Sequence, residues 1–245
     1  DLINQIKERL LNQIKPVFML AEWETPDLHI EAFDMTYSWD IYHIMNDIYK
    51  KNKNVKDIFR QLAKEKKQYP ENAFRMRFLT NHDENSWNGT EFERLGNGVE
   101  AFAVVSATIP GMFLLYSGQE IGLNKRLDFF EKDPIEWKES NLTEFYKKLI
   151  SLKKNNQALW NGEKGGDLIK IKNSNDSSVI SFIRKKNNNK IFVLANLTKN
   201  PVDININNQE IIGNYFNLFS DVDISLKQNE NFSLQPWEYK IFVKK

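Results

Sequence analysis

A glutamate stands where the first strongly apolar segment of the chain ends. Residues 17–21 read Val-Phe-Met-Leu-Ala, and Glu22 and Trp23 follow. In a barrel of parallel strands the catalytic groups lie at the carboxyl ends of the strands. A carboxyl group held there beside an indole is desolvated, which raises its pKa and keeps a proton available for donation. We therefore predict that Glu22 is a general acid; the alternatives are that it only ends a strand and faces water, or that Glu24 has this role.

A second polar cluster follows another apolar run. Residues 74–80 alternate apolar side chains with two arginines, and five polar residues come directly after them, among them Asn81, His82 and Asp83. The cluster is either a site in which Asp83 is a second carboxylate, or the N-cap of a helix, because Asn and Asp are favoured at that position. The residue types alone do not decide between these two interpretations.

Six tryptophans accompany these groups. We expect Trp23, Trp39 and Trp87 to lie next to the candidate carboxylates, where they suit stacking on the apolar face of a sugar ring, with core packing as the alternative. Large aromatic side chains are mostly buried, so we predict core packing for the other three. These are Trp137, Trp160 and Trp237.

Other kinds of site find no support in the sequence. The 245 residues include no cysteine, no Gly-x-Ser-x-Gly and only three histidines, none of them at i, i+4 spacing. This excludes a thiolate nucleophile and gives no indication of a serine triad or a zinc site. With 34 basic and 33 acidic side chains there is no basic footprint for nucleic acid, and the apolar runs fall far short of the roughly 18 residues that span a bilayer. We predict a soluble globular chain without a nucleic-acid or membrane partner.

The pattern up to residue 160 is that of strands alternating with helices. Short apolar runs predict strands, and the amphipathic stretches between them predict helices, as in βα units that build a parallel sheet. The predicted strands are 17–21, 33–37, 74–80 and 112–116. The predicted helices are 1–15, 40–50, 55–67, 98–108 and 143–155, the last entered through a capping box of Asn141 and Glu144.

The glycine-rich stretch 161–166 is the best candidate for a domain boundary, because the apolar period changes there from helical to alternating. The predicted domains are residues 1–160 and 161–245. In the second we predict an all-β sandwich. Its strands are expected at 168–172, 179–184, 190–196, 202–206 and 239–243.

Three segments, in order and in rough spacing, resemble strand motifs of the α-amylase superfamily, glycoside hydrolase family 13. Segment 18–23 resembles the motif of the fifth barrel strand, segment 78–83 that of the seventh and segment 110–122 that of the eighth. The β region that closes with residues 234–242 is similar to the C-terminal sandwich of these enzymes. The resemblance covers essentially the whole chain. It implies an α/β fold, the second half of a (β/α)8 TIM barrel (strands 5 to 8), followed by an all-β sandwich.

The resemblance also implies roles for individual residues. Glu22 matches the general acid/base that protonates the glycosidic oxygen and later activates water. Asp83 matches the second invariant carboxylate, which binds sugar hydroxyls and stabilises the transition state, and His82 matches a histidine that binds the sugar. Asn81 and Trp23, which flank these residues, are expected to bind substrate as well. The implied activity is retaining hydrolysis of α-glucosidic bonds in starch or maltooligosaccharides, and no cofactor is implied by the residues present.

One part of the family pattern has no match in the chain. The family's nucleophilic aspartate lies on the fourth strand in a Gly-Phe-Arg-x-Asp type motif, and helix 1–15 corresponds to the helix after that strand. The resemblance therefore implies a fragment, inactive alone, whose partner is the missing N-terminal half of the same barrel; any calcium would be bound through that half. Hydrolase, transglycosylase and isomerase activities remain open. The alternative is a non-catalytic carbohydrate-binding or structural protein derived from such an enzyme.

Overall fold

A four-stranded parallel sheet forms the first part of the computed structural model, which describes residues 2–11, 17–30 and 32–245. The strands follow one another in chain order across the sheet, and all neighbours are parallel. They are β1 (Leu20–Ala21), β2 (Met35–Tyr37), β3 (Phe74–Arg77) and β4 (Met112–Phe113). The predicted parallel strands are thus confirmed, although each is shorter than its apolar run. β1 and β4 form the two edges of the sheet among the described residues.

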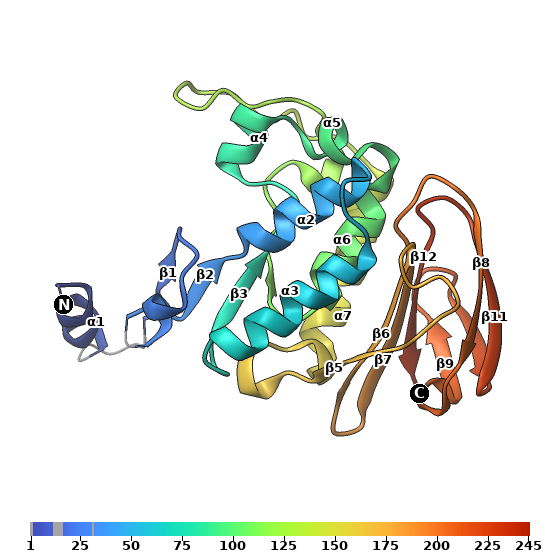
Figure 1. Ribbon diagram of the computed structural model, residues 1–245. Helices are drawn as coiled ribbons and strands as arrows, with labels where there is room; N and C mark the ends of the chain where they lie inside the picture. The colour runs from blue at the N-terminus through green and yellow to red at the C-terminus, as the bar shows by residue number, and fades with distance from the viewer. Residues whose placement is uncertain (1, 12–16, 31) are drawn as a thin grey trace.

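Helices α2 to α6 lie between these strands along the chain, α1 precedes β1 and α7 follows β4; Figure 1 shows α1 apart from the sheet, at the far left. Their bounds are α1 Leu2–Leu11, α2 Trp39–Tyr49, α3 Val55–Gln68, α4 His82–Asn88, α5 Glu91–Leu95, α6 Val99–Thr108 and α7 Asn141–Asn155. Short 3₁₀ turns η1 to η6 lie at Pro26–His29, Gly96–Gly98, Gln119–Ile121, Gln157–Leu159, Gly162–Lys164 and Gln209–Ile211. The prediction for 1–15 also includes residues 1 and 12–15, which lie outside the described residues.

Side chains at the helix ends explain where two of these helices begin. Asn54 and Asp57 form a reciprocal capping box, so α3 starts at Val55 as predicted. The predicted capping box of α7 is wrong. Ser140 caps that helix by accepting a hydrogen bond from the backbone N–H of Leu142, because the helix starts at Asn141 itself.

Antiparallel strands make up residues 167–244 and lie on the right of Figure 1. Six strands form one sheet in the order β10-β9-β12-β7-β6-β5, and β11 pairs with β8 in a second sheet. Their bounds are β5 Asp167–Lys170, β6 Val179–Lys186, β7 Asn189–Asn196, β8 Val202–Asn207, β9 Gly213–Asn217, β10 Val222–Leu226, β11 Asn229–Leu234 and β12 Tyr239–Lys244. Five of these strands were predicted. The sequence did not predict β9, β10 and β11.

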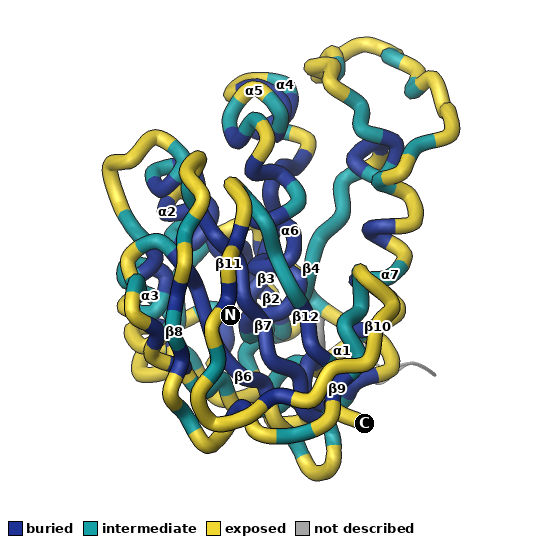
Figure 2. Tube along the Cα trace, turned by 90° about the vertical axis from the view of Figure 1, so that its right-hand side faces the viewer, coloured by how far each residue is buried: buried dark blue, intermediate teal, exposed yellow. Residues whose placement is uncertain are grey.

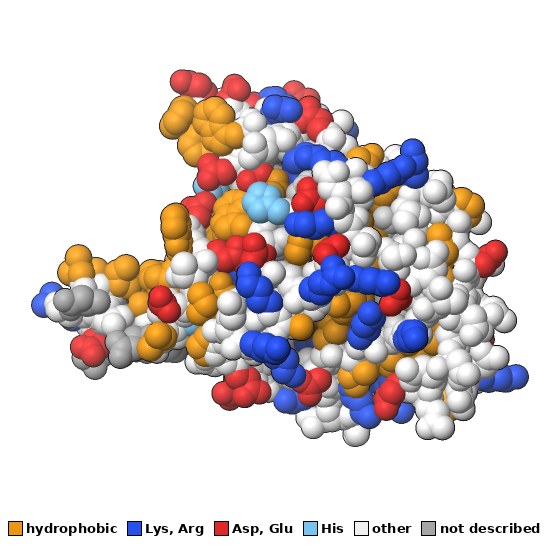
Figure 3. Space-filling view, viewed as in Figure 1, with side chains coloured by type: hydrophobic (Ala, Val, Ile, Leu, Met, Phe, Trp, Pro, Cys, Tyr) orange, Lys and Arg blue, Asp and Glu red, His pale blue; other side chains and the backbone are white. Residues whose placement is uncertain are grey.

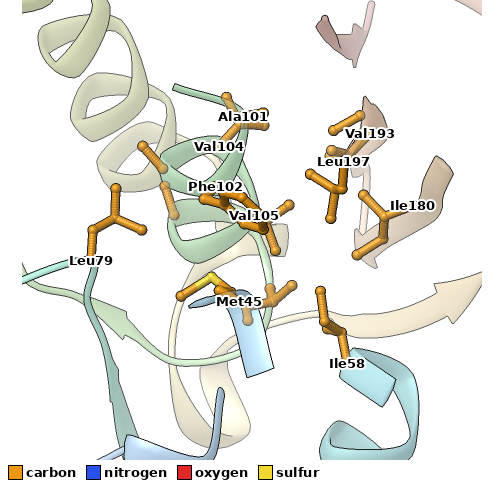
Figure 4. Close-up of a cluster of buried hydrophobic side chains, with 14 of the residues drawn as sticks. Met45, Ile58, Leu79, Ala101, Phe102, Val104, Val105, Ile180, Val193 and Leu197 are labelled. Atoms are coloured by element: carbon orange, nitrogen blue, oxygen red, sulfur yellow. The ribbon is translucent and has the colours of Figure 1, made fainter. Parts of the chain in front are cut away.

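Two hydrophobic cores share the antiparallel sheet. One fills the space between the six-stranded and two-stranded sheets and includes Phe192 and Phe242, with Ile204 from the facing sheet. The other joins the helices to the opposite face of β6 and β7. In Figure 4, Phe102 and Val105 of α6 point toward side chains of the sheet, and Figure 2 shows the buried residues concentrated along α6 and these strands. α6 is buried on all sides, because every residue from Ala101 to Thr108 has at most 1% exposure.

None of the described helices is both long enough and apolar enough to cross a membrane.

Candidate active site

Three side chains that the sequence singled out meet at the carboxyl edge of the parallel sheet. Nε2 of His82 lies 3.4 Å from Oε1 of Glu22 and 3.8 Å from Oδ2 of Asp83. One polar atom of each of the three lies within 4.8 Å of the others. Each side chain remains open to solvent, with exposures of 48% for Glu22, 46% for His82 and 41% for Asp83. We call this group the carboxylate–histidine cluster.

Parallel pairing places Glu22 in the cluster. Ala21 of β1 pairs with Thr36 of β2, and the backbone N–H of Tyr37 donates to the carbonyl of Trp23 at 3.2 Å, so the chain stays extended beyond the strand. Glu22 therefore leaves the sheet at the same edge as the residues after β3.

The polar cluster after β3 is also a helix N-cap. Oδ1 of Asn81 accepts a 2.7 Å hydrogen bond from the backbone N–H of Glu84, which starts α4 at His82. His82 and Asp83 lie in the first turn and are open to solvent, whereas Asn81 is only 1% exposed. The N-cap interpretation is therefore confirmed for Asn81, and a site at His82 and Asp83 stays a prediction. Asn81 holds the backbone, and the next two side chains face the carboxyl edge of the sheet.

α4 is fixed from behind by buried polar contacts. The hydroxyl of Tyr42 in α2 donates a hydrogen bond to the carboxylate of Glu84, and Nδ2 of Asn88 donates to the same oxygen at 3.0 Å. The side chain of Asn85 accepts from the backbone N–H of Leu127 at 2.8 Å. These contacts hold the first turn of α4, and hence His82 and Asp83, against α2 and the loop after β4.

Glu24 occupies a different environment. It pairs with Arg75 and accepts a 3.0 Å hydrogen bond from the backbone N–H of Asp40, with only 16% of its side chain exposed. Burial raises the pKa of Glu24, and the adjacent Arg75 partly offsets this. Because its carboxylate is already engaged by two partners, Glu24 is a member of a buried ion pair, and Glu22 is the carboxylate that faces the site.

The desolvation expected for Glu22 is not observed. Its side chain is about half exposed, and Trp23 beside it is 65% exposed. The reason is the position of β1 at an edge of the described sheet, where no described strand covers its second side.

Tyr37 is a neighbour of the cluster that sequence reasoning missed. It ends β2 and is 6% exposed. Burial raises the pKa of its hydroxyl above the ordinary value, and the negative charge of Glu22 raises it further. The rule that selected Glu22, inspection of the residue at the end of each apolar run, also selects Tyr37 when a phenol is counted as a hydrogen-bonding group.

The tryptophans divide differently from the prediction. Trp87 is 58% exposed, as stacking on a ligand requires, whereas Trp39 packs against Tyr37 and Phe78. Core packing is wrong for two further tryptophans, Trp137 at 62% and Trp160 at 40% exposure. Trp237 does pack on the core, with its ring 5.4 Å from that of Tyr49.

The cluster does not match a calcium site. Calcium takes about six to eight oxygen ligands, whereas this group offers two carboxylates and an imidazole. No other group of three histidine or acidic side chains in the described part of the chain converges to ligand distance.

Comparison with known proteins relates this chain to amylases. Residues 169–241 match the family model described as the C-terminal domain of maltogenic amylase. The chain is 27% identical over 208 residues to α-amylase 2 of Dictyoglomus thermophilum, which covers 78% of this chain and 34% of that protein.

Solved structures agree on the fold. A noncanonic maltogenic α-amylase, AmyB of Thermotoga neapolitana, superposes with a TM-score of 0.82 at 23% identity, covering 98% of this chain and 57% of that one. A cyclomaltodextrinase superposes with a TM-score of 0.83 at 16% identity, covering 98% of this chain and 42% of that one. The resemblance to the α-amylase superfamily is therefore confirmed, and it is to the C-terminal part. The chain spans about a third of the curated relative and about half of these structures.

Proposed function

We propose that this chain supplies the acid/base half of an active site that hydrolyses α-glucosidic bonds of starch or maltooligosaccharides with retention of configuration. The observation that carries the proposal is the carboxylate–histidine cluster, in which residues matched to three family roles converge from two strand ends. The related amylases named above support the reaction class.

In the proposed mechanism, Glu22 protonates the glycosidic oxygen as the bond breaks and then removes a proton from the attacking water. His82 lies within reach of the same sugar and donates a hydrogen bond to a hydroxyl group. Asp83 accepts hydrogen bonds from sugar hydroxyls, and its negative charge stabilises the oxocarbenium-like transition state. Asn81 and Trp23 flank the sugar, Trp23 through its exposed ring.

A retaining reaction also needs a nucleophilic carboxylate about 5 Å from the acid, on the opposite side of the sugar. The resemblance assigns Asp83 to substrate binding and provides no nucleophile from this chain. We propose that the nucleophile belongs to a fourth barrel strand outside this sequence, so that the cluster is catalytic only when that strand is present.

The proposed architecture follows from the same comparison. We assign β1 to β4 to strands five to eight of a (β/α)8 barrel, with residues 1–160 as the barrel half and 161–245 as the C-terminal sandwich domain. Strand order and parallel pairing support this assignment. The two sheet edges would close against the missing half, which would also cover Phe18 and Leu20, now 50% and 43% exposed near β1.

Structures of similar folds support the substrate class. One of them, AmyP, is described in complex with maltose and with maltotriose, and an α-amylase of Geobacillus thermoleovorans is described in complex with acarbose. We propose that this chain meets the same class of α-linked glucose oligomers.

The test has two arms. First, the coding sequence upstream of Asp1 is read for an Arg-x-Asp strand motif. Second, the purified chain is assayed on soluble starch alone and joined to that upstream segment, with Glu22→Gln in the joined protein. We expect turnover only in the joined protein and its loss in the variant. Turnover by the pure chain alone would show that the nucleophile is not missing.

A non-catalytic carbohydrate-binding protein is a second candidate, favoured by the extensive core that joins α6 to β6 and β7 within this chain alone. It predicts a stable monomer of 28.9 kDa. Size-exclusion chromatography with intact mass distinguishes the candidates, because a half barrel with two open edges is expected to associate or aggregate.

A further inference from the structure

Three exposed aromatic rings form a continuous wall beside the carboxylate–histidine cluster. Trp87 is on α4, and Phe129 and Phe130 are in the loop between β4 and α7. The ring centroids lie 5.4 Å apart for Trp87 and Phe129, and 4.8 Å apart for Phe129 and Phe130. Exposures are 58%, 39% and 82% respectively. We call these three residues the aromatic wall; Figure 3 shows hydrophobic atoms gathered there, at the upper left.

The aromatic wall is continuous with the proposed active site. The ring of His82 stacks on that of Phe129, with centroids 5.9 Å apart and planes at 28°. The same imidazole lies 3.4 Å from Glu22. One row of rings therefore leads from the candidate acid outward to Phe130, so a ligand that passes His82 meets an aromatic face next.

Hydrogen bonds hold the loop that carries the two phenylalanines. The backbone N–H of Leu127 donates to Asn85, and its carbonyl accepts from the hydroxyl of Ser86 at 2.6 Å. Asp133 pairs with Lys125 and also accepts a 3.1 Å hydrogen bond from the backbone N–H of Asp128. The rings are thus positioned before a ligand arrives, which reduces the entropy lost on binding.

Charge around the aromatic wall favours a neutral ligand. Segment 125–133 carries three basic side chains and three acidic ones. Such a balance does not attract an anionic surface or a nucleic-acid backbone. A glucose ring suits the wall, because it presents an apolar C–H face to an aromatic ring and keeps its hydroxyls in water. Exposed aromatic patches in proteins commonly mark a binding site.

We propose that Trp87, Phe129 and Phe130 form a sugar-stacking subsite that binds the part of an α-glucan extending beyond His82, away from the scissile bond. This inference rests on the proposed function and adds a preference to it. Binding energy from distant sugar units contributes to positioning at the reacting bond, so longer α-glucans are the better ligands.

The inference is tested by calorimetric titration of the joined protein with maltoheptaose and with maltose, with Glu22→Gln as the common reference background that prevents hydrolysis of the ligands. We expect Trp87→Ala to weaken maltoheptaose binding about fivefold to tenfold, which is the size of one lost aromatic contact, and to leave maltose binding unchanged. Trp137→Ala is the matched control, since its ring is 62% exposed and makes no ring contact among the described residues. Phe130→Ala repeats the test at the most exposed ring, should Trp87→Ala fold poorly.

Equal maltoheptaose affinity in the reference protein and in its Trp87→Ala and Phe130→Ala variants would overturn the subsite, as would a loss equal for maltose and maltoheptaose. An absence of maltoheptaose binding by the folded reference protein would overturn it too. The proposed function is judged separately, by turnover of the joined protein and of its Glu22→Gln variant. An active joined protein with unaffected wall variants would therefore reject the subsite alone.

Discussion

Oε1 of Glu22 lies 3.4 Å from Nε2 of His82, although the two residues follow strands β1 and β3 that are separated by β2. The contact exists because parallel strands end at the same edge of the sheet. The side chains that follow β1 and β3 therefore meet beyond the end of β2. Tyr37 ends that middle strand beneath them.

Glu22→Gln is expected to reduce kcat of the joined protein by about 10²- to 10⁴-fold, because the amide has no proton to donate to the glycosidic oxygen. The thermal stability of the protein should stay the same, since the side chain is half exposed and forms no ion pair other than that with His82 in the described part of the chain. Steady-state kinetics on maltoheptaose and a melting curve check both parts. Retained kcat in Glu22→Gln would remove Glu22 from the acid role.

Glu24→Gln should leave kcat of the joined protein unchanged. Burial already raises the pKa of Glu24, and Arg75 keeps Glu65 and Thr36 as partners, so loss of the Glu24 charge should change the free energy of unfolding by no more than about 1 kcal/mol. Steady-state kinetics and urea unfolding measure the two parts. If Glu24→Gln instead abolishes kcat with unchanged stability, the assignment of roles to the two glutamates is wrong.

Glu65 is the buried carboxylate of α3 that pairs with two arginines of β3. Its two oxygens pair with Arg77 at 2.5 and 2.9 Å, and Arg75 Nε lies 3.7 Å away. We expect Glu65→Gln to lower the free energy of unfolding by about 3–5 kcal/mol, because two buried guanidinium groups lose their charge partner. Glu71→Gln, at an exposed position, is the control and should stay within about 0.5 kcal/mol.

The effect of Glu65 should also depend on pH. Burial raises the pKa of Glu65, but pairing with Arg77 outweighs it, so the folded-state pKa lies below 4.5. The ion pair therefore stabilises the fold above the unfolded carboxyl pKa and is lost as pH falls through the folded value. The difference between wild type and Glu65→Gln in urea unfolding should shrink below about pH 4. A difference that grows on acidification would contradict the pairing.

The strand ends that carry the site were predicted, and the exposed strands were not. Glu22 and Asp83 follow runs of apolar residues whose length and order indicate neighbouring parallel strands. β10 reads Val-Asp-Ile-Ser-Leu, so an alternation of apolar and polar side chains was present and was missed, although only Leu226 of its five residues is buried. β11 was missed as well, since Asn229 and Asn231 belong to residue types typical of turns, and pairing with β8 decides its conformation.

The sequence also did not predict how far some individual side chains are buried. Trp160 was expected in the core, yet its ring lies near the surface because its indole N–H donates to the carbonyl of Lys154 at 3.0 Å. The converse holds for Asn81, whose polar side chain is buried by a local cap that only the start of α4 reveals.

Gly111, in the segment that resembles the eighth-strand motif, has a backbone conformation that requires glycine. Its φ is +131°, and an added Cβ would lie 2.4 Å from the carbonyl oxygen of Arg75 and 2.7 Å from Nε of Arg77. We expect Gly111→Ala to destabilise the chain by at least about 2 kcal/mol in urea unfolding. Ser117→Ala, at an exposed position in the same segment, should have an effect within about 0.5 kcal/mol. Equal stabilities of the two variants would contradict the close approach of β3 and β4 at this position.

Glu91 in α5 is a buried acid whose pKa burial raises to about 7, with a smaller opposing effect of Arg94. It is 1% exposed, and its Oε1 has no hydrogen-bond partner in the described part of the chain. Glu100, Glu120 and the buried Tyr146 are the titratable groups of adjacent elements in the same electrostatic environment. Ionisation of Glu91 inside this group is therefore unfavourable.

The sign of the pH dependence follows from that shift. Between pH 4.5 and 7 the folded chain binds more protons at Glu91 than the unfolded chain, so stability falls as pH rises and then stays at the lower value. Glu91→Gln carries no such charge and should be more stable than wild type by about 3 kcal/mol at pH 8, but nearly equal to it at pH 5. Other groups titrate equally in both proteins, so their contribution drops out when the two free energies of unfolding are subtracted. His29, whose pKa burial lowers to about 4, is one of these groups. Urea unfolding at both pH values measures this difference in the free energy of unfolding, with the exposed Glu144→Gln as control. If the stabilities of wild type and Glu91→Gln depend on pH in the same way, Glu91 is ionised without penalty in the fold.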